Sequence, residues 1–492
     1  MKPPGTQGLV LEEPLIFERG SPGRRGYALP ELDAPEAKSP DGIEGHLVRG
    51  ELEGFPEVSE FDVVRHYTRL AQYNYCIDAG LFPLGSCTMK YNPKLHESLV
   101  RHPGFSRLHP LMPEAFAQGA LRILWELTED LRKCVGMHAC ALNPAAGAHG
   151  EFTGVLMIRA YHLDRGGRRR KIIVPATAHG TNPATAAMCG FEVVPLEAKA
   201  SRLTVDEVRA VVDDETAAIM LTNPSTLGLF ENQIADIGDL IHSQGGLLYC
   251  DGANLNAIVG QASMGKMGVD VSQFNLHKTF STPHGGGGPG AGAVVVSERL
   301  EPYLPSPCIV KNGDRYAFSH DRPKSIGRIR SFFSNFGINL RAWAYIKTMG
   351  NSGLKEMSGA AVLNANYLRV QLKDSFRLAF DEPCMHEAVF SDELQRPHGV
   401  TTLDIAKRMI DKGYHPPTVF FPLVVRNALM IEPTESESKE TLDQFVAAMR
   451  EIAAEAKDNP ELLRTAPHGA FRRRLDETRA ARQPVLRWAP KS

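Results

Sequence analysis

Lys278 stands where a lysine can act as a nucleophile. It lies in the run Phe274-Asn-Leu-His-Lys-Thr-Phe-Ser-Thr-Pro-His-Gly-Gly-Gly-Gly-Pro-Gly290, among small and hydroxyl-bearing residues. Desolvation in such a turn lowers the pKa of a lysine, so that its amine can attack an aldehyde. A lysine taken at random is a surface residue, so the case for Lys278 depends on its neighbours in the chain.

Asp251 gives this lysine an electronic partner. The apolar run Leu247-Leu-Tyr-Cys ends in Asp251 and is followed by small residues, so we expect the acid at the carboxyl end of a strand. Ligands bind at that edge of open α/β sheets. A carboxylate there can keep a pyridine nitrogen protonated, which turns the ring into an electron sink. An ordinary helix N-cap is the competing interpretation.

Two loops can bind a phosphate group and a face of such a ring. In Asn143-Pro-Ala-Ala-Gly-Ala-His-Gly-Glu151, the backbone N–H groups of Ala146, Gly147 and Ala148 can bind a phosphate at the start of a helix. A plain tight turn fits this loop equally well. His179 follows a strand and can stack on the ring and transfer protons, although a loop histidine is usually a surface residue.

The order of these groups is more informative than any one of them. Asn223 or Thr226, at the end of a further strand, can also reach a cofactor or substrate. A phosphate loop, a histidine, a strand-end aspartate and a lysine about 25 to 30 residues later resemble the layout of a fold-type I enzyme that uses pyridoxal 5'-phosphate. We therefore expect this cofactor to be bound covalently to Lys278 as a Schiff base.

The elements that must position these groups follow from the pattern of the chain. After Ala141, short β-rich runs alternate with helical patterns, which predicts a mostly parallel α/β sheet. The β-rich runs are Lys171–Val174, Glu192–Pro195, Ala217–Thr222, Gly246–Cys250 and Ala291–Val296, and the helical patterns include Gly150–Asp164 and Ile234–Gln244. The expected fold is that of the aspartate aminotransferase-like, fold-type I α/β enzymes, with a smaller C-terminal α/β domain.

Three parts are expected along the chain. Residues 1–58, rich in Pro, Gly and charge, form an extended arm that either wraps a partner subunit or is a disordered tail. Residues 59–340 form the large cofactor-binding domain, and residues 341–492 form the small domain. Helical or mixed patterns are Ser59–Ala79, Ala115–Cys134, Ala342–Met349, Ala360–Leu372, Val400–Lys412, Thr418–Val425, Ala428–Glu432 and Ser438–Lys457, and the Arg-rich stretch 472–482 is expected as a solvated helix or coil.

Composition narrows the choice of partners. With 492 residues and a formal net charge of -2, the chain gives no electrostatic reason to expect nucleic acid or an anionic membrane as a partner, since those need a clustered basic surface. No apolar stretch approaches the roughly 20 residues of a membrane helix. The N-terminus has neither an apolar signal core nor a transit pattern, so we expect a cytoplasmic protein. The 8 cysteines show no CxxC spacing, so we expect reduced thiols and no metal site.

Five segments resemble the glycine decarboxylase P-protein family. They are Pro83-Leu-Gly-Ser-Cys-Thr-Met-Lys-Tyr-Asn-Pro93, Ala178-His-Gly-Thr-Asn-Pro183, Asp251-Gly-Ala-Asn-Leu-Asn256, Asn275-Leu-His-Lys-Thr-Phe280 with its glycine run, and Ile431-Glu-Pro-Thr-Glu-Ser-Glu-Ser-Lys-Glu-Thr441. They span most of the chain and resemble the C-terminal half of the long fused members, which keeps the cofactor lysine. The resemblance implies the second subunit of a two-subunit glycine dehydrogenase (decarboxylating), working with a homologous first subunit as an α2β2 assembly.

The resemblance also assigns roles. It implies that Lys278 carries the cofactor, that His179 stacks on the ring and serves in proton transfer, and that Asp251 pairs with the pyridine nitrogen. Gly147 and Ala148 would belong to the phosphate site. Further contacts would come from Thr226, Asn254 and His277, and the loop around Ser86, Cys87 and Thr88 would line the substrate pocket. One departure is His149, where long members tend to have Gln, which puts one side-chain contact in doubt.

The implied activity is decarboxylation of glycine, with transfer of the aminomethyl group to the lipoyl arm of H-protein in the glycine cleavage system. One alternative is another fold-type I enzyme acting on amino acids, which the same constellation permits. A second is a cofactor-free structural subunit, against which the presence of both Lys278 and Asp251 argues. Arg328 and Arg330 are candidates for anion binding, with a solvated or interface role as the alternative.

Overall fold

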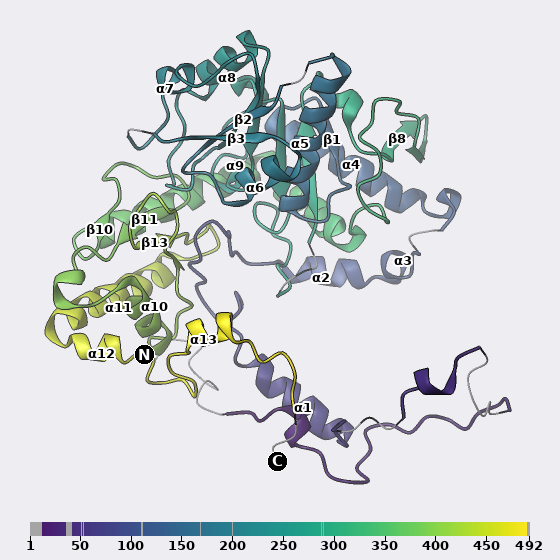
Figure 1. Ribbon diagram of the computed structural model, residues 1–492, viewed down its shortest axis with the longest axis vertical. Coiled ribbons are helices and arrows are strands. Elements are labelled where there is room, and N and C mark those ends of the chain that lie inside the picture. Colours follow the sequence, from purple (N-terminus) through teal and green to yellow (C-terminus); the bar gives the residue numbers. More distant parts are fainter. Residues whose placement is uncertain are drawn as a thin grey trace.

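The computed structural model describes residues 12–35, 42–50, 52, 54–109, 112–167, 169–198, 200–286, 288 and 290–489 (Figure 1). The expected arm at 1–58 therefore lies partly outside the described residues, as do Gly287 and Pro289 of the glycine run. None of the helices within the described ranges has the length and apolarity needed to span a bilayer.

A seven-stranded sheet forms the centre of the larger part of the molecule. Its strand order is β1-β7-β6-β5-β4-β2-β3. The strands from β3 to β6 run parallel, whereas β7 and β1 are antiparallel to their neighbours at one edge. The bounds are β1 Ala139–Ala141, β2 Lys171–Pro175, β3 Glu192–Leu196, β4 Thr216–Thr222, β5 Leu247–Asp251, β6 Val271–Asn275 and β7 Gly292–Val296.

Helices cover both faces of this sheet, because successive strand residues point to opposite sides. Ile219 and Leu221 of β4 pack with α4 (Gln118–Val135), α8 (Ile234–Ser243) and α9 (Phe336–Leu372). Ala218 and Met220 pack on the other face with α5 (Gly147–Asp164) and α6 (Thr181–Met188). The result is a three-layer α/β sandwich whose central strands are fully buried.

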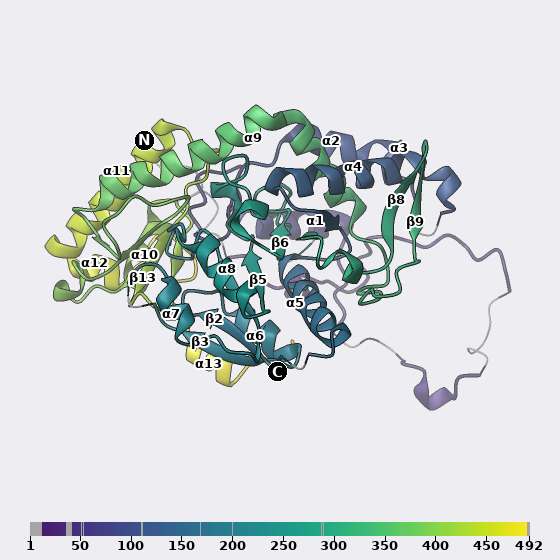
Figure 2. The same cartoon turned by 90° about the horizontal axis from the view of Figure 1, so that it is seen from above.

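Helix α9 joins the two main parts of the molecule (Figure 2). It contacts α2 (Lys94–Arg101) and α4 on the large side, and α11 (Lys439–Asp458) and β11 on the small side. Gly350, with φ 60°, breaks its helical geometry and produces a kink. The proposed domain boundary at residues 340 and 341 falls inside this helix.

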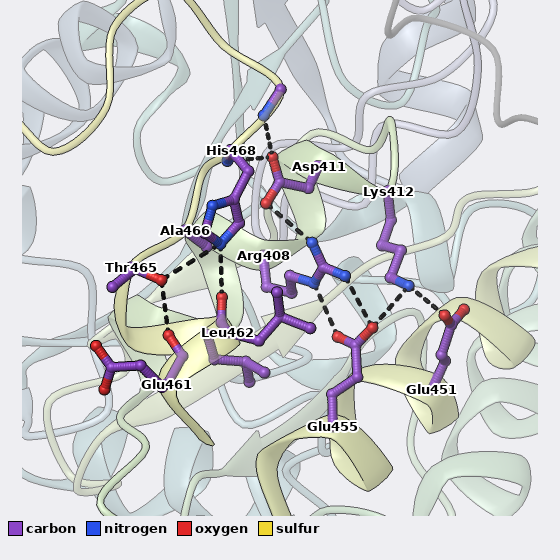
Figure 3. A network of polar contacts seen from close by, with 12 residues as sticks. Arg408, Asp411, Lys412, Glu451, Glu455, Glu461, Leu462, Thr465, Ala466 and His468 are labelled. Atoms are coloured by element: carbon purple, nitrogen blue, oxygen red, sulfur yellow. Dashed lines mark hydrogen bonds and ion pairs between the residues drawn. The ribbon is translucent and has the colours of Figure 1, made fainter. Parts of the chain in front are cut away.

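The small part has its own antiparallel sheet, in the order β10-β11-β13-β12, and its own apolar core. Its elements are β10 Arg377–Leu378, β11 Ala388–Ser391, α10 Thr402–Asp411, β12 Thr418–Val419, β13 Ala428–Ile431, α11 and α12 Pro460–Arg464. A polar network fastens α10 to α11 and to the chain after α12 (Figure 3). Arg408 makes two hydrogen bonds of 2.8 Å to Glu455, while Asp411 accepts from the backbone of His468 at 2.6 Å.

The remaining elements lie at the periphery. They are α1 Glu60–Ala71, α3 Pro103–Ser106, α7 Val205–Arg209, α13 Glu477–Arg482, the hairpin β8 Cys308–Asn312 with β9 Arg315–Ser319, and seven short 3₁₀ turns among the described residues at Ile16–Glu18, Gly45–Leu47, Glu114–Phe116, Leu255–Ala257, Gly265–Met267, Glu301–Tyr303 and Arg396–His398. Stacked rings of Phe17 and Trp488, 4.8 Å apart, join the two ends of the described chain.

The five predicted β-rich runs of the large sheet are confirmed, within two residues at each end. Three expectations are wrong in extent. The helix expected at Ser59–Ala79 ends at Ala71, and the two helices expected at 342–349 and 360–372 are one kinked helix. The run at 418–425 gives only the two-residue strand β12 before the chain turns at Pro422.

Candidate active site

The carboxyl ends of β2, β4, β5 and β6 open into one cavity of about 400 Å³. Parallel strands bring these ends to the same edge of the sheet, as the topology requires. Of the residues that the sequence predicts for the site, Ser86, Cys87, Gly147, Ala148, His179, Thr226, Asp251, Asn254, His277 and Lys278 line this cavity. Ala146 and Thr88 are not among the lining residues, although each is adjacent in sequence to one that is.

Lys278 lies in the tight turn that follows β6. Its backbone N–H donates to the carbonyl of Asn275 at 3.0 Å, and its side chain faces the cavity. Two imidazoles lie beside it, with ring centroids 4.7 Å apart. Burial lowers the pKa of His277 to about 3 and that of His284 to about 4, and the charge of Lys278 acts in the same direction on both. At neutral pH both imidazoles are therefore neutral.

Asp251 ends β5 and is held by three donors. The amide of Asn182 donates at 3.1 Å, the backbone of Ala253 at 2.8 Å and the amide of Gln273 at 2.5 Å. Gln273 is itself oriented by the hydroxyl of Tyr249. This network fixes the direction in which the carboxylate faces the cavity. An N-cap role does not apply, because the chain continues into a turn and the 3₁₀ turn Leu255–Ala257 is capped by Asn254.

The start of α5 forms the opposite end of the cavity. Ala146 is the N-cap residue, so the first N–H groups of the helix, beginning at Gly147, have no intrahelical acceptor and can bind an anion. A Cβ on Gly147 would lie 2.1 Å from the side-chain nitrogen of Asn275, so any other residue requires Asn275 or the helix start to shift. His149 turns back and accepts the N–H of Ala145 at 3.1 Å. His149, which stands where the long members of the resembled family tend to have Gln, thus makes a hydrogen bond inside the loop.

A hydrogen-bonded chain runs from His179 into the protein. Its Nδ1 lies 2.9 Å from the hydroxyl of Thr181, which lies 2.9 Å from a carboxylate oxygen of Glu151. Partial burial lowers the pKa of His179, whereas burial together with the charge of Asp251 raises the pKa of Glu151. The ring of Phe421, from the small part of the chain, contacts His179 edge-on at 5.7 Å.

Thr226 and Asn254 line the cavity and also hold its loops together. The Thr226 hydroxyl donates to the carbonyl of Thr177, and the Asn254 amide donates to the carbonyl of Pro224 at 3.0 Å. Asn223, the other candidate on this loop, is buried away from the cavity and accepts the N–H of Glu231 at 3.0 Å.

The loop at Ser86 to Thr88 closes the cavity from the side of the small sheet. Burial raises the pKa of Cys87 to about 11, so it is a neutral thiol at neutral pH. Arg328 and Arg330 lie outside the cavity. Arg328 donates to the carbonyl of Ser331, and Arg330 lines a separate apolar hollow with Phe332 and Phe336.

Several cavity residues were not among the predicted ones. Glu151, Thr181 and His284 stand inside the quoted motifs, where their polar type next to a predicted loop was the available signal. Gln273 precedes the lysine on a strand that was not recognised. Thr418 and Phe421 come from the small part of the chain, and no local pattern links them to a site that is distant in sequence.

The observed groups fit pyridoxal phosphate. The glycine cradle at Gly147 and the helix start suit a phosphate, Asp251 faces the cavity for a ring nitrogen, and Lys278 offers an amine between them. The carboxylate ends β5, and the lysine follows the adjacent strand β6, whose Gln273 is paired with Asp251 in the register of the sheet.

Comparison with known proteins gives consistent results. The family described as "Glycine dehydrogenase, C-terminal domain" matches residues 357–468, and "Aminotransferase class-V" matches residues 153–310. A probable glycine dehydrogenase (decarboxylating) subunit 2 of Bacillus licheniformis is 54% identical over 97% of this chain and 99% of its own length. One from Listeria welshimeri is 52% identical, with 97% of this chain and 99% of its own length covered.

Solved structures show the same fold at low identity. The chain is similar to a glycine decarboxylase (P-protein) of the glycine cleavage system, with a TM-score of 0.71 and 19% identity over 84% of this chain and 93% of that chain. An aspartate aminotransferase from Thermus thermophilus gives a TM-score of 0.58 and 15% identity over 76% of this chain and 99% of that chain. The expected aspartate aminotransferase-like α/β fold is confirmed.

Proposed function

The chain belongs to the glycine dehydrogenase (decarboxylating) subunit 2 family, and we propose from this premise how its cavity carries out the reaction. The activity is decarboxylation of glycine within the glycine cleavage system, with pyridoxal phosphate as cofactor. The bond between the α-carbon of glycine and its carboxylate breaks and CO2 leaves. The electron pair ends in a new bond from that carbon to one sulfur of a lipoyl disulfide. The disulfide bond breaks, and the second sulfur takes a proton.

Pyridoxal phosphate, when bound, supplies the electron sink that makes this bond cleavage feasible. Lys278 would hold it covalently, Asp251 would pair with its ring nitrogen, and the N–H groups from Gly147 and Ala148 would bind its phosphate. The observation that carries this assignment is the convergence of all three groups on one cavity. The Asn182, Ala253 and Gln273 donors keep Asp251 pointed at the ring position.

His179 would exchange protons with the reacting carbon or sulfur through Nε2, because Nδ1 is engaged by Thr181. The backbone N–H of Thr181 also donates to Nδ1 at 3.2 Å, so Nδ1 is an acceptor and a neutral His179 carries its proton on Nε2. When Glu151 is protonated, it can donate to the hydroxyl of Thr181, which in turn donates to Nδ1. The chain and the backbone N–H together keep the proton of His179 on Nε2, from which it can be donated.

The companion of a "subunit 2" is a subunit 1. We assign the lipoyl arm to H-protein and the assembly to an α2β2 complex of this chain with its homologous first subunit. Exposed apolar side chains on the described part of the arm, Tyr27, Leu29 and Leu32, are 73% to 84% exposed and are available for a neighbouring subunit. This favours the partner-wrapping role of the arm over that of a free tail.

The test is co-expression with the first subunit, followed by exchange of labelled bicarbonate into the carboxyl group of glycine. We expect exchange that requires lipoylated H-protein and is lost in Lys278→Ala together with the visible absorbance of the bound cofactor. Lys266→Ala, an exposed lysine, is the matched control and should keep both. Decarboxylation of bulkier amino acids without H-protein would identify another fold-type I enzyme instead.

A colourless wild-type protein, prepared with excess pyridoxal phosphate, would contradict the catalytic assignment. It would leave the structural role, in which this chain only supports a catalytic paralogue.

A further inference from the structure

Two glutamates of the small sheet are buried side by side behind the cavity. The antiparallel register pairs Ala388 of β11 with Ile431 of β13, so Glu387 and Glu432 occupy the next cross-strand positions. Both side chains are 0% exposed. Like charges directly opposite each other in a sheet are unfavourable, so this pair requires a specific role or a shared proton.

Each carboxylate binds the backbone of the loop that closes the cavity. The N–H of Ser86 donates to Glu387 at 2.7 Å, and the N–H of Thr88 donates to Glu432 at 2.9 Å. The hydroxyl of Ser86 also lies 3.3 Å from Glu387. Two hydrogen bonds to carboxyl oxygens, from the residues on either side of Cys87, fix both ends of a short segment.

These bonds hold a conformation that the chain does not favour by itself. Ser86 has φ 60° and Thr88 has φ 50°, in the left-handed region that non-glycine residues rarely adopt. Gly85 is pressed against Met430, since a Cβ there would lie 2.2 Å from its side chain. Without the carboxyl acceptors of Glu387 and Glu432, we expect the loop to leave this backbone conformation.

The loop forms part of the cavity wall through Gly85, Ser86 and Cys87. A displacement of the clamped segment therefore changes the space in which a small substrate sits opposite Lys278. By contrast, the hydrogen bonds that the described residues make to Asp251 and within the loop before α5 involve neither Glu387 nor Glu432. The expected consequence is an effect on glycine more than on cofactor binding.

The surroundings favour one proton shared by the pair. Burial raises the pKa of both Glu387 and Glu432. The charge of Glu432 raises the pKa of Glu387 further, and the charge of Glu435 raises that of Glu432. His386 brings no charge, since burial lowers its pKa to about 3. Lys278 is the cation whose charge opposes these shifts. Cys87, the remaining titratable neighbour, is a neutral thiol.

We propose that Glu387 and Glu432 are positioning residues that share one proton and clamp the Ser86–Thr88 loop as the wall of the glycine site. The proposal rests on the proposed function for its substrate, and on the hydrogen bonds alone for its mechanics. Loss of the shared proton at high pH puts two charges opposite each other and loosens the loop. Glycine binding then weakens as the pH rises.

The kinetic test compares alanine and glutamine variants in the co-expressed complex. Glu387→Ala and Glu432→Ala remove an acceptor, and we expect the KM for glycine to rise about tenfold or more, with kcat less affected. Glu387→Gln and Glu432→Gln keep an oxygen for the loop N–H and cannot ionise. We expect them to keep a near wild-type KM at pH 7 and to lose the rise in KM between pH 7 and 9. Glu393→Ala, an exposed acid after β11, is the matched control.

A second readout is independent of activity. The rate at which a thiol reagent modifies Cys87 in the holoenzyme, followed by mass spectrometry, reports how tightly the loop is held. We expect faster modification in the alanine variants and an unchanged rate in the glutamine variants, with the exposed Cys76 as the internal reference. A wild-type complex without exchange activity but with this pattern would overturn the proposed function and keep the clamp.

Three results would overturn the clamp. The first is an unchanged KM and Cys87 rate in folded alanine variants, and the second is a pH dependence of KM that survives in the glutamine variants. The third concerns metal, because the donor atoms of His386, Glu387 and Glu432 lie within 4.8 Å of one another. Stoichiometric zinc or manganese in the purified protein, lost in His386→Ala, would make the cluster a metal site. If the alanine variants fail to fold, the pH profile of the glutamine variants decides.

Discussion

Glu151 supports, at the scale of single residues, the form of His179 whose proton lies on Nε2. The two residues are joined through the hydroxyl of Thr181, by contacts of 2.9 Å on each side, and the backbone N–H of Thr181 also donates to Nδ1 of His179. Because burial raises the pKa of Glu151, the chain holds a transferable proton at a higher pH than an exposed glutamate would allow. A protonated Glu151 can therefore donate through the hydroxyl of Thr181 toward Nδ1 of His179.

Glu151→Gln should therefore lower the bicarbonate exchange rate by about 10- to 100-fold, since the amide cannot pass a proton. In the wild type, Glu151 loses the proton that it donates as the pH rises through its raised pKa, so the exchange rate should fall. This fall should be absent in the variant. Thr181→Val should reproduce the rate loss because it breaks the chain, and Thr181→Ser should restore it. A Thr181→Val enzyme with wild-type rates would show that His179 works without the chain.

Gly147 lies where a larger side chain would collide with a neighbour. An alanine would place its Cβ 2.1 Å from Asn275, at the start of the helix assigned to the phosphate. Gly147→Ala should weaken cofactor binding by about tenfold or more, because the helix start or Asn275 must move. Titration of the apoprotein with pyridoxal phosphate measures this directly. Gly119→Ala, at a helix position with open space around it, should bind the cofactor normally.

At the scale of elements, the packing of α10 against α11 depends on the network of Figure 3. Arg408 joins Glu455 by two parallel hydrogen bonds and also contacts Asp411 at 3.1 Å, and its side chain is only 14% exposed. Such a bidentate, partly buried pair is worth more than an exposed one.

Arg408→Ala should lower the free energy of unfolding by about 1 to 3 kcal/mol, because it leaves Glu455 and Asp411 without their shared cation. Urea unfolding followed by circular dichroism provides the measurement. Arg464→Ala removes the exposed pair with Glu461 and should change stability by less than about 0.5 kcal/mol. Equal effects of the two substitutions would mean that the network adds nothing beyond a surface pair.

Elements with a strong local pattern were predictable, and those defined by distant contacts were not. Strand β4 has an entirely apolar interior, Ala217–Leu221, so its existence and place could be deduced. Strand β6 contains Ser272 and Gln273, and these polar residues are buried because Gln273 binds Tyr249 and Asp251, which no local pattern records. The patterns at 342–349 and 360–372 predicted two helices, whereas the structure has one helix with a kink at Gly350.

The candidate site shows the same division. The cofactor end could be deduced because each group follows its own strand or starts its own helix. The substrate wall could only be assigned by resemblance, since its shape depends on Ser86 and Thr88 meeting glutamates some 300 positions away. Phe421, which contacts His179, was missed for the same reason.

At the scale of the whole molecule, pH acts on stability through two opposing sets of buried groups. Burial lowers the pKa of His277 and His284. As the pH falls below about 6.5, these histidines bind protons in the unfolded chain but not in the folded protein, so the free energy of unfolding decreases. Buried glutamates act in the opposite direction. Glu231, which precedes α8 and accepts the N–H of Leu203 at 3.1 Å, has its pKa raised to about 7 by burial.

The sign for Glu231 follows from proton linkage. Between its ordinary pKa of 4.5 and its folded pKa of about 7, the folded protein binds more protons than the unfolded chain, so stability falls as the pH rises.

Glu231→Gln removes this loss while its amide oxygen can still accept from Leu203. The histidine contributions are shared by both proteins and cancel in the difference. The stability of the variant minus that of the wild type should therefore increase by about 1 to 3 kcal/mol from pH 4.5 to 7.5 and stay constant above. Urea unfolding at several pH values tests this, with the exposed Glu192→Gln as control. A difference that does not change with pH would mean that Glu231 titrates normally in the folded protein.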